Sequence, residues 1–391
     1  MTRVGFVLSY TDSAWLGGIN YLSNLLHAVA KAPDLQIEPV LVLSAATPTK
    51  LLENFPVVPM LHTPLADTEH RAWALTRKLT ERGLGCDVLM QRFLRQHNIE
   101  VLSHSGHLGP RAGLPSVGWL PDFQHLRMPE FFKPTEIAAR DRGYARIAKH
   151  CSTVILSSID AQRDLERFMP SAVPNSRVLH FVSGFAGGET PVASEARLRE
   201  RYGIDGLYFH LPNQFWAHKN HRVVIDALAL LKARGRPALV LCTGHTQDRR
   251  QPGHFDDLLR HATQLGVEDN FRVLGLVPYE DLAGLTRHAV AVVNPSLFEG
   301  WSTTVEESKS LGLNIVLSDI PVHREQAPEF GVFFDPRAPQ SLADALTQVL
   351  DAHSPEAALA HQARAREQLP RRFAAFGAQY QAVVLDTLAR A

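Results

Sequence analysis

Residues 289–312 read AVAVVNPSLFEGWSTTVEESKSLG, and this stretch decides the fold class. Ala291–Asn294 is a short, mostly apolar run of the kind that forms a buried β-strand. A polar turn follows, and Thr303 with Glu306 three residues later is the sequence pattern of a helix capping box. We therefore expect a helix that begins at about Thr304, directly after the strand. A strand followed closely by a helix is the repeating unit of α/β proteins.

The same alternation of short apolar runs and helical patterns extends along the chain. Helical patterns lie between the runs, for example over Ile19–Ala30 and His221–Ala233. The expected strands of the first half are Val4–Leu8, Ile37–Leu43, Val101–Ser103, Ser116–Trp119, Thr153–Ser157 and Val178–Leu179, and those of the second half are Tyr208–Leu211, Ala238–Cys242, Phe271–Leu274, Ala291–Asn294 and Asn314–Leu317. Such alternation predicts parallel sheets with helices on both faces.

The stretch Ser183–Ser194 (SGFAGGETPVAS) consists mainly of small residues, which indicates a linker. A chain of 391 residues is long enough for roughly two to three domains. We expect two doubly wound, Rossmann-like α/β domains, residues 1–185 and 195–370, that face a cleft at the carboxyl ends of their strands. Residues 371–391 are amphipathic and are expected to form a helix that returns to the first domain.

Composition limits the partners and the compartment of the protein. Lys and Arg total 40 and Asp and Glu total 40, so no global positive field is available to hold nucleic acid. The three cysteines lie far apart without CxxC spacing, which argues against a disulfide framework and for a reducing compartment. No apolar run approaches the roughly 20 residues of a membrane span, so we expect a cytoplasmic protein. A peripheral contact with the inner face of the membrane stays open, because the helix expected over Glu136–His150 is rich in basic residues.

Hydroxyl and carboxylate side chains surround the start of the helix expected after the strand in residues 289–296. The first N–H groups of a helix favour a phosphate, and Ser302, Thr303 and Thr304 add hydroxyl donors. Carboxylates beside a phosphate would repel it. We therefore expect Glu299 and Glu307 to accept hydrogen bonds from neutral hydroxyl groups, such as those of a sugar ring and a ribose. The alternative interpretation is a capped surface helix with solvated glutamates.

Seven residues separate Glu299 from Glu307, and the pair is followed by Ser-x-x-Leu-Gly and by a strand that ends in SDIPVHRE (318–325). This combination resembles the retaining GT-B glycosyltransferases of the large "group 1" family. The resemblance covers most of the second half of the chain and weaker parts of the first half. It implies that Glu299 contacts the donor sugar, that Glu307 contacts the nucleotide ribose, and that the adjoining Gly300 belongs to the donor site. It also implies transfer with retention of anomeric configuration.

A second motif, HLPNQFWAHKNHRVVIDAL (210–228), follows a strand and opens a helix near Asn220. The family usually has an Arg five residues before a Lys, and both grip the diphosphate. Here the Lys is Lys219, but Gln214 occupies the Arg position, so the resemblance places both residues in the donor site with one cation fewer. Arg222 and Arg324 are candidates to compensate, and the NQFW-x-HKNH form resembles a subgroup found in polysaccharide clusters. The alternative is a solvated lysine at a helix start, a placement that the helix dipole disfavours.

Two further loops extend the candidate donor site. The resemblance implies that the loop around Val277, in LGLVPYEDL (274–282), offers backbone groups to the nucleobase. Gly17 and Gly18 follow the first strand without a G-x-G-x-x-G fingerprint. A glycine pair lets the backbone approach a ligand closely, and the resemblance favours a loop beside the donor phosphates and the acceptor. A plain tight turn is the alternative.

Acceptor contacts are expected in the stretch GWLPDFQHLRMPEFF (118–132). Asp122 matches an Asp of the family, and Asp122 and His125 lie just past a strand end, where acceptor contacts or proton handling would occur. The alternative is that both residues cap a loop. His245, in CTGH (242–245), lies near the phosphate end by topology.

No metal ion and no cofactor are expected. His104, His107 and His125 are the conceivable zinc ligands, but they show no fixed ligand spacing. The absent dinucleotide fingerprint also disfavours a nicotinamide dehydrogenase.

The sequence therefore predicts a metal-independent glycosyltransferase of the hexosyltransferase type, in cell-surface polysaccharide or glycoconjugate synthesis. It would move a sugar from a nucleotide diphosphate sugar, bound by residues 195–370, to a hydroxyl of a sugar or lipid-linked acceptor, bound by residues 1–185. Glu299, Lys219 and Asp122 are the expected catalytic residues. Two alternatives stay open: a non-hydrolysing sugar-nucleotide epimerase on the same scaffold, and an inactive nucleotide-sugar-binding partner subunit. The missing Arg is the feature that supports the second alternative.

Overall fold

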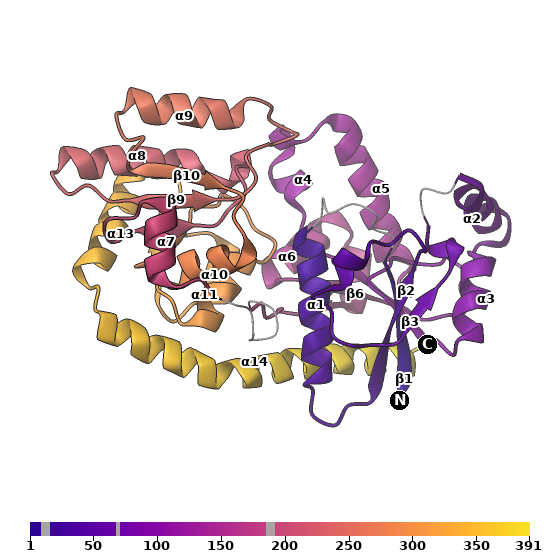
Figure 1. Ribbon diagram of the computed structural model, residues 1–391. Helices are drawn as coiled ribbons and strands as arrows, with labels where there is room; N and C mark the ends of the chain where they lie inside the picture. The colour runs from indigo at the N-terminus through magenta and orange to yellow at the C-terminus, as the bar shows by residue number, and fades with distance from the viewer. Residues whose placement is uncertain (9–15, 68–70, 185–191) are drawn as a thin grey trace. The chain divides into compact units, whose positions relative to one another are not determined.

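A computed structural model of the protein describes residues 1–8, 16–67, 71–184 and 192–391. The chain divides into two compact units, each with one parallel sheet (Figure 1). Unit 1 consists of Met1–Arg127, Lys133–Val182 and Pro370–Ala391, and unit 2 consists of Met128–Phe132 and Ser183–Leu369. The expected architecture, two Rossmann-like α/β units, is confirmed. Residues 185–191 of the expected linker lie outside the described residues.

Unit 1 contains a seven-stranded sheet with the strand order β3-β2-β1-β4-β5-β6-β7. All neighbouring strands pair in parallel. The order reverses between β1 and β4, so the switch point of the unit lies at the carboxyl ends of these two central strands. The strands are β1 (Thr2–Leu8), β2 (Ile37–Leu43), β3 (Met60–His62), β4 (Val101–Ser103), β5 (Ser116–Leu120), β6 (Thr153–Leu156) and β7 (Ser176–Val178), and the helices are α1 (Leu16–Ala30), α2 (Arg71–Leu84), α3 (Val88–Gln96), α4 (Gln124–Arg127), α5 (Pro134–His150), α6 (Ile159–Phe168) and the end of α14 (Pro355–Ala389).

The end of α14 packs against the sheet and α1 of unit 1. The Tyr380 hydroxyl donates to Ser103 Oγ at the end of β4 (2.7 Å), and Thr387 bonds Thr153 at the start of β6 (2.7 Å). Gly377 lies so close to α1 that a Cβ atom there would be 2.0 Å from the carbonyl oxygen of Ala28. The last turns of α14 therefore complete one face of unit 1, as the sequence pattern of residues 371–391 predicts.

Replacement of Gly377 by alanine should destabilise the protein. Two helix backbones cannot separate locally without disturbing their packing, so the overpacking should cost about 1–3 kcal/mol and lower Tm by a few degrees. Gly143, inside α5, is the matched control, because nothing lies within 4 Å of an added Cβ there. Gly143→Ala should be neutral or stabilising by about 0.5–1 kcal/mol. Equal melting temperatures for the two variants would contradict the close α1–α14 contact.

Unit 2 contains a six-stranded parallel sheet with the order β10-β9-β8-β11-β12-β13, which reverses between β8 and β11. Its strands are β8 (Phe209–Leu211), β9 (Val240–Thr243), β10 (Phe271–Gly275), β11 (Val292–Asn294), β12 (Ile315–Ser318) and β13 (Gly331–Phe334), and its helices are α7 (Glu195–Tyr202), α8 (His221–Ala233), α9 (His254–Gln264), α10 (Tyr279–Arg287), α11 (Thr303–Leu311), α12 (Pro321–Gln326), α13 (Pro339–Asp351) and the start of α14. Alternate residues of each strand point to opposite faces, so the sheet has a core on both sides.

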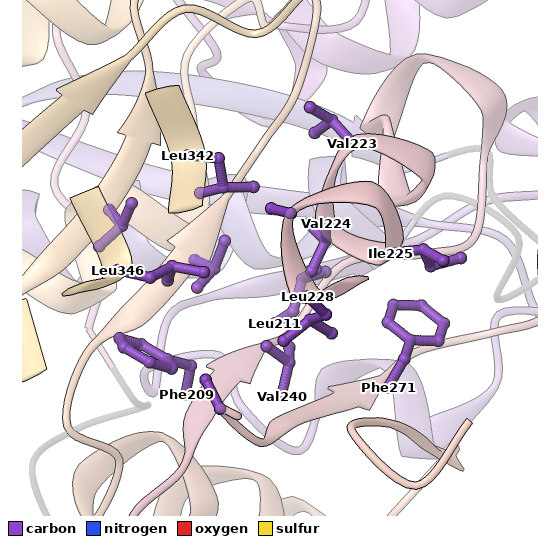
Figure 2. Close-up of a cluster of buried hydrophobic side chains, with 14 of the residues drawn as sticks. Phe209, Leu211, Val223, Val224, Ile225, Leu228, Val240, Phe271, Leu342 and Leu346 are labelled. Carbon is purple, nitrogen blue, oxygen red and sulfur yellow. The ribbon is translucent and has the colours of Figure 1, made fainter. Parts of the chain in front are cut away.

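The larger core of unit 2 lies between the sheet and helices α8 and α13. Figure 2 shows Val224 and Leu228 of α8 beside Leu211 and Val240 of the strands, with Leu346 of α13 completing the cluster. On the opposite face, Val292 and Ile315 pack against Val305 of α11. This second core holds α11 against the sheet, so the N-terminus of α11 is fixed at the carboxyl edge of the strands.

Three local expectations differ from the structure. Two short strands at sheet edges, β3 and β13, are absent from the expected set; β3 is largely exposed. Helix α14 begins at Pro355, well before residue 371. Gly17 and Gly18 lie in the first turn of α1, so the expected glycine loop is wrong at these positions. The helix extends through them because the following apolar residues, such as Leu22 and Leu25, are buried and stabilise it by packing.

Candidate functional site

The candidate site lies at the switch point of unit 2. Lys219 follows β8 through a 3-10 turn, Ala217–Lys219, and Glu299 follows β11. Strands β8 and β11 are neighbours in the sheet, and the strand order reverses between them. In an open α/β sheet, ligands bind outside the carboxyl ends of the strands at this point.

Lys219 and Glu299 form an ion pair. Lys219 Nζ lies 2.6 Å from Glu299 Oε1, and the two side chains are 14% and 11% exposed. Ser296 Oγ donates to the same oxygen (2.6 Å). Burial raises the pKa of Glu299, but Lys219 and Ser296 outweigh burial and hold this pKa below its usual value. The carboxyl group is therefore ionised at neutral pH.

Both partners of this ion pair keep hydrogen-bonding capacity. An ammonium group has three N–H donors, and Glu299 engages one of them. Among the described residues, no hydrogen bond reaches Glu299 Oε2, because both donors use Oε1. The pair can therefore present N–H donors to an anion and a carboxylate oxygen to a hydroxyl group at the same time.

Asn220 fixes the backbone next to Lys219. It has a φ of 57°, a left-handed conformation that asparagine tolerates better than most residues. Its side-chain nitrogen donates to the carbonyl oxygens of Pro295 (3.1 Å) and Pro336 (2.9 Å). Because Pro295 directly follows β11, these bonds tie the Lys219 turn to the loop that carries Glu299.

A buried amide network joins the same strand ends to α11. Asn213 Nδ2 donates to Asn294 Oδ1 (3.2 Å), and Asn294 Nδ2 donates to Ser302 Oγ (2.8 Å). The Thr304 hydroxyl donates to Asn213 Oδ1 (3.3 Å). The sequence pattern predicts only a strand residue at Asn294. The available signal was its position at the end of β11, where an amide can bridge two loops.

Helix α11 begins one residue earlier than expected. Its N-cap is Ser302, whose Oγ accepts from Val305 N (3.4 Å), so the prediction of Thr303 as N-cap is wrong. The capping box with Glu306 is also wrong, because Glu306 Oε1 accepts from Lys309 Nζ (3.0 Å) and Gln326 Nε2 (3.1 Å). The hydrogen bond from Asn294 explains the shift, since it fixes Ser302 Oγ in the capping position.

The first turn of α11 presents N–H groups to the edge where Lys219 lies. The N–H of Ser302 donates to Gln326 Oε1 (3.2 Å), and that of Val305 is capped. Thr303 and Thr304 remain, and the geometry of a helix start leaves their N–H groups without intrahelical acceptors. Such groups favour an anion. Gly300, half-buried, lies in the loop between Glu299 and this turn.

Glu307 has a different environment from Glu299. Within the described residues, its hydrogen-bond partner is Ser183, whose Oγ lies 3.5 Å from Glu307 Oε1. Burial raises the pKa of Glu307 to about 7, and the weak Ser183 contact opposes this rise only slightly. Ser183 is itself held by the Ser310 hydroxyl, which donates to its carbonyl oxygen (2.6 Å). The Glu307 carboxyl therefore holds its proton more readily than an ordinary glutamate, and it has no cation within salt-bridge distance in the described part of the chain.

Gln214 and Val277 occupy the loops after β8 and β10. Gln214 Oε1 accepts a hydrogen bond from the backbone N–H of His245 (2.8 Å). Val277 lies between β10 and α10, half-buried against the cluster around Leu241 and Leu285. Arg324, one of the two candidates to replace the missing cation, is engaged by both carboxylate oxygens of Asp319 (2.6 Å each).

The candidate residues of unit 1 lie in a different unit from Lys219 and Glu299. Asp122 follows β5, is half-buried and accepts from Gln124 N (2.9 Å). His125 is fully buried, and its Nε2 lies 3.1 Å from Asp141 Oδ1. Burial lowers the pKa of His125, so its ring is neutral and packed in the core. This placement favours a structural role for His125, whereas Asp122 keeps a partly exposed carboxylate.

Among the described residues, no group of three or more His, Cys, Asp or Glu side chains is arranged to hold a metal ion. Of the helices described, none combines the length and the apolar character that crossing a membrane requires.

The candidate site lies within a stretch of the chain that matches a known protein family. Residues 181–366 match the family described as Glycosyl transferases group 1. O-antigen chain mannosyltransferase B of Escherichia coli is 31% identical over 135 residues, 34% of this chain and 34% of that protein. Mannosylfructose-phosphate synthase of Agrobacterium fabrum is 26% identical over 132 residues, 33% of this chain and 29% of that protein. The matched stretches thus span about a third of the length of these curated relatives.

A solved structure extends the likeness over the whole chain. Anabaena HepE in complex with UDP and glucose matches 99% of this chain and 100% of its own, with a TM-score of 0.70 and 18% identity. At this identity the likeness concerns the fold, two Rossmann-like domains as in GT-B glycosyltransferases. The family match supports the resemblance of the Glu299 and Glu307 region to the group 1 family.

Proposed function

We propose that the protein is a glycosyltransferase that moves a sugar from a nucleotide diphosphate sugar to an acceptor hydroxyl. One observation carries this proposal: the Lys219–Glu299 ion pair lies at the switch point of unit 2 and keeps free N–H donors and a free carboxylate oxygen. A diphosphate needs the donors, and a sugar hydroxyl needs the oxygen. The family match over residues 181–366 supports the same reaction class.

In the proposed mechanism, the bond between the anomeric carbon and the diphosphate oxygen breaks, and the acceptor oxygen bonds to that carbon with retention. Lys219 and the N–H groups of Thr303 and Thr304 stabilise the negative charge that develops on the leaving diphosphate. Glu299 Oε2 accepts from a donor-sugar hydroxyl and holds the anomeric carbon toward the acceptor. The acceptor proton passes to an oxygen of the leaving phosphate.

The remaining site residues receive supporting roles in this proposal. Glu307 accepts from the ribose hydroxyls, and the backbone around Val277 contacts the base. Unit 1 binds the acceptor, with Asp122 as the carboxylate that contacts it. We place the reaction in polysaccharide or glycoconjugate synthesis at the cytoplasmic side of a membrane, because the Escherichia coli relative is an O-antigen chain mannosyltransferase.

The two alternative functions lead to different expected results. A sugar-nucleotide epimerase would convert the nucleotide sugar without an acceptor. An inactive binding subunit would bind it without turnover. A thermal-shift panel of UDP-, GDP-, ADP- and dTDP-sugars is the first test, since a ligand at 100 times its Kd adds about 2.7 kcal/mol of stability. Release of nucleoside diphosphate that depends on an added acceptor would then support transfer. Failure of every nucleotide sugar to stabilise the protein would contradict the proposal.

Transfer is expected to continue after chelation. The proposed mechanism assigns the diphosphate charge to Lys219 and the first turn of α11, so a divalent ion has no part in it. Turnover measured with and without EDTA should agree within error. Loss of activity in EDTA that magnesium or manganese restores would contradict this assignment.

Affinity for the nucleotide sugar is expected to rise with pH up to about pH 7 and to level off above it. Burial raises the pKa of Glu307 to about 7 in the free protein, and ribose hydroxyls donate stronger hydrogen bonds to its ionised form than to its neutral form. Binding therefore favours loss of the proton, so affinity falls as pH decreases through 7, by up to about tenfold per pH unit. Calorimetry on wild type and Glu307→Gln isolates this effect, because the variant should lose that part of the pH dependence. Identical pH profiles would remove Glu307 from the ribose site.

A further inference from the structure

The loops that follow β8 and β9 are joined by three hydrogen bonds. His245 N donates to Gln214 Oε1 (2.8 Å), and Phe215 N donates to the carbonyl oxygen of His245 (3.0 Å). Ala217 N donates to Asp248 Oδ2 (3.1 Å). The backbone of His245 is thus held on both sides by the loop that ends at Lys219.

The two loops are in backbone contact next to His245. Gly244 has a φ of 144°, and a Cβ atom there would lie 2.5 Å from the carbonyl oxygen of Asn213. Only glycine fits this position without displacing the β8 loop. The contact brings the His245 loop to the same edge of the sheet as Lys219, beside the switch point.

The orientation of the His245 ring follows from one further bond. His245 Nδ1 accepts from Gln247 N (3.0 Å). A backbone N–H can only donate, so Nδ1 carries no proton and the neutral ring carries its proton on Nε2. The side chain is exposed, and no acceptor for the Nε2–H lies among the described residues. The Nε2–H of His245 is therefore an oriented hydrogen-bond donor without an acceptor in the described part of the chain.

Resting on the proposed function, we propose that His245 is a further donor-site residue: its Nε2–H donates to a phosphate oxygen of the nucleotide diphosphate sugar. Gln214 is then a positioning residue that fixes the His245 peptide. The pair supplies a hydrogen bond at the place where an Arg five residues before Lys219 would supply a charge. Lys219 supplies the positive charge, whereas His245 supplies a directional hydrogen bond without a charge.

The test is calorimetry with whichever of UDP, GDP, ADP or dTDP binds the wild type, and with the matching nucleoside by competition. His245→Ala should weaken the diphosphate about tenfold, the loss expected for a hydrogen bond to a charged group, and should leave the nucleoside unchanged. His353→Ala is the matched control, because His353 follows α13 at the other end of the strands. It should bind both ligands as wild type does.

A double-mutant cycle separates Gln214 from His245. Gln214→Met keeps the length of the side chain but removes the acceptor, so it should weaken diphosphate binding in the wild type and have no effect in His245→Ala. Full additivity would show that Gln214 is an independent ligand and overturn its positioning role. Unchanged diphosphate affinity in a folded His245→Ala, or an equal loss for the nucleoside, would overturn the assignment of His245. If no diphosphate binds the wild type, the proposed function itself fails.

Discussion

Replacement of Lys219 by alanine is expected to weaken nucleoside diphosphate binding about 10- to 100-fold. A charge-assisted contact to a phosphate contributes about 1.5–3 kcal/mol, and Lys219 is the cation that the structure places at the switch point of unit 2. The same change leaves the Glu299 carboxyl group, which is 11% exposed, without its cation. The variant should therefore also lose about 2–3 kcal/mol of stability.

A second variant separates these two effects. Adding Glu299→Gln to Lys219→Ala removes the unpaired buried charge, so thermal stability should largely recover. Diphosphate affinity should stay low, because the ammonium group is still missing. Calorimetry and thermal unfolding on the single and double variants provide both readouts. A double variant that recovers stability and binds the diphosphate as wild type does would show that Lys219 acts only as a structural counter-ion.

Glu299→Gln is expected to reduce turnover about 10- to 100-fold while the affinity for free diphosphate stays at least as high as in wild type. The amide preserves the shape and can still accept from Lys219, but it replaces the free Oε2 by an NH2 group. Hydrogen bonds to a carboxylate are about twice as strong as neutral ones, so about 1.5–3 kcal/mol of sugar positioning is lost. Removing the negative charge also leaves Lys219 free for phosphate.

The measurement for Glu299 is a pair of numbers: turnover with the true donor and affinity for the free diphosphate. Glu299→Asp is a useful companion, because it keeps the charge and withdraws the carboxylate by one methylene. Turnover of Glu299→Asp should also decrease. The stability of this variant should still depend on Lys219, because the carboxylate still needs a cation. Normal turnover in Glu299→Gln would exclude Glu299 from the donor sugar and remove the main reason to prefer transfer over nucleotide binding.

Local patterns predicted most of the regular structure. Ile37–Leu43 and His221–Ala233 form a strand and a helix with the expected bounds, because each is a continuous apolar run or stripe that needs no distant partner to be recognised. Strand β3 was missed because an edge strand buries little, so its sequence carries no clear alternation. The first turn of α1 was missed because its stability depends on the packing of later residues.

The sequence shows the candidate residues of the site but not the contacts between them. The spacing of Glu299 and Glu307 and the lysine at 219 are visible in the sequence. The pairing of Lys219 with Glu299 joins residues 80 positions apart, and no local pattern encodes it. The N-cap moved from Thr303 to Ser302 for the same reason, since Asn294, on another element, decides which hydroxyl is held in place.

The division of unit 1 between the two ends of the chain has a consequence for biosynthesis. Domains usually complete their folding in the order in which they leave the ribosome. Here the face of unit 1 that carries Ala28, Ser103 and Thr153 stays uncovered until Gly377, Tyr380 and Thr387 have been made. Unit 2 closes with Leu369, before that point. Of the two units, the one whose translation begins earlier is therefore the last to finish folding, and a nascent chain stalled at about Pro370 would expose an incomplete surface to chaperones.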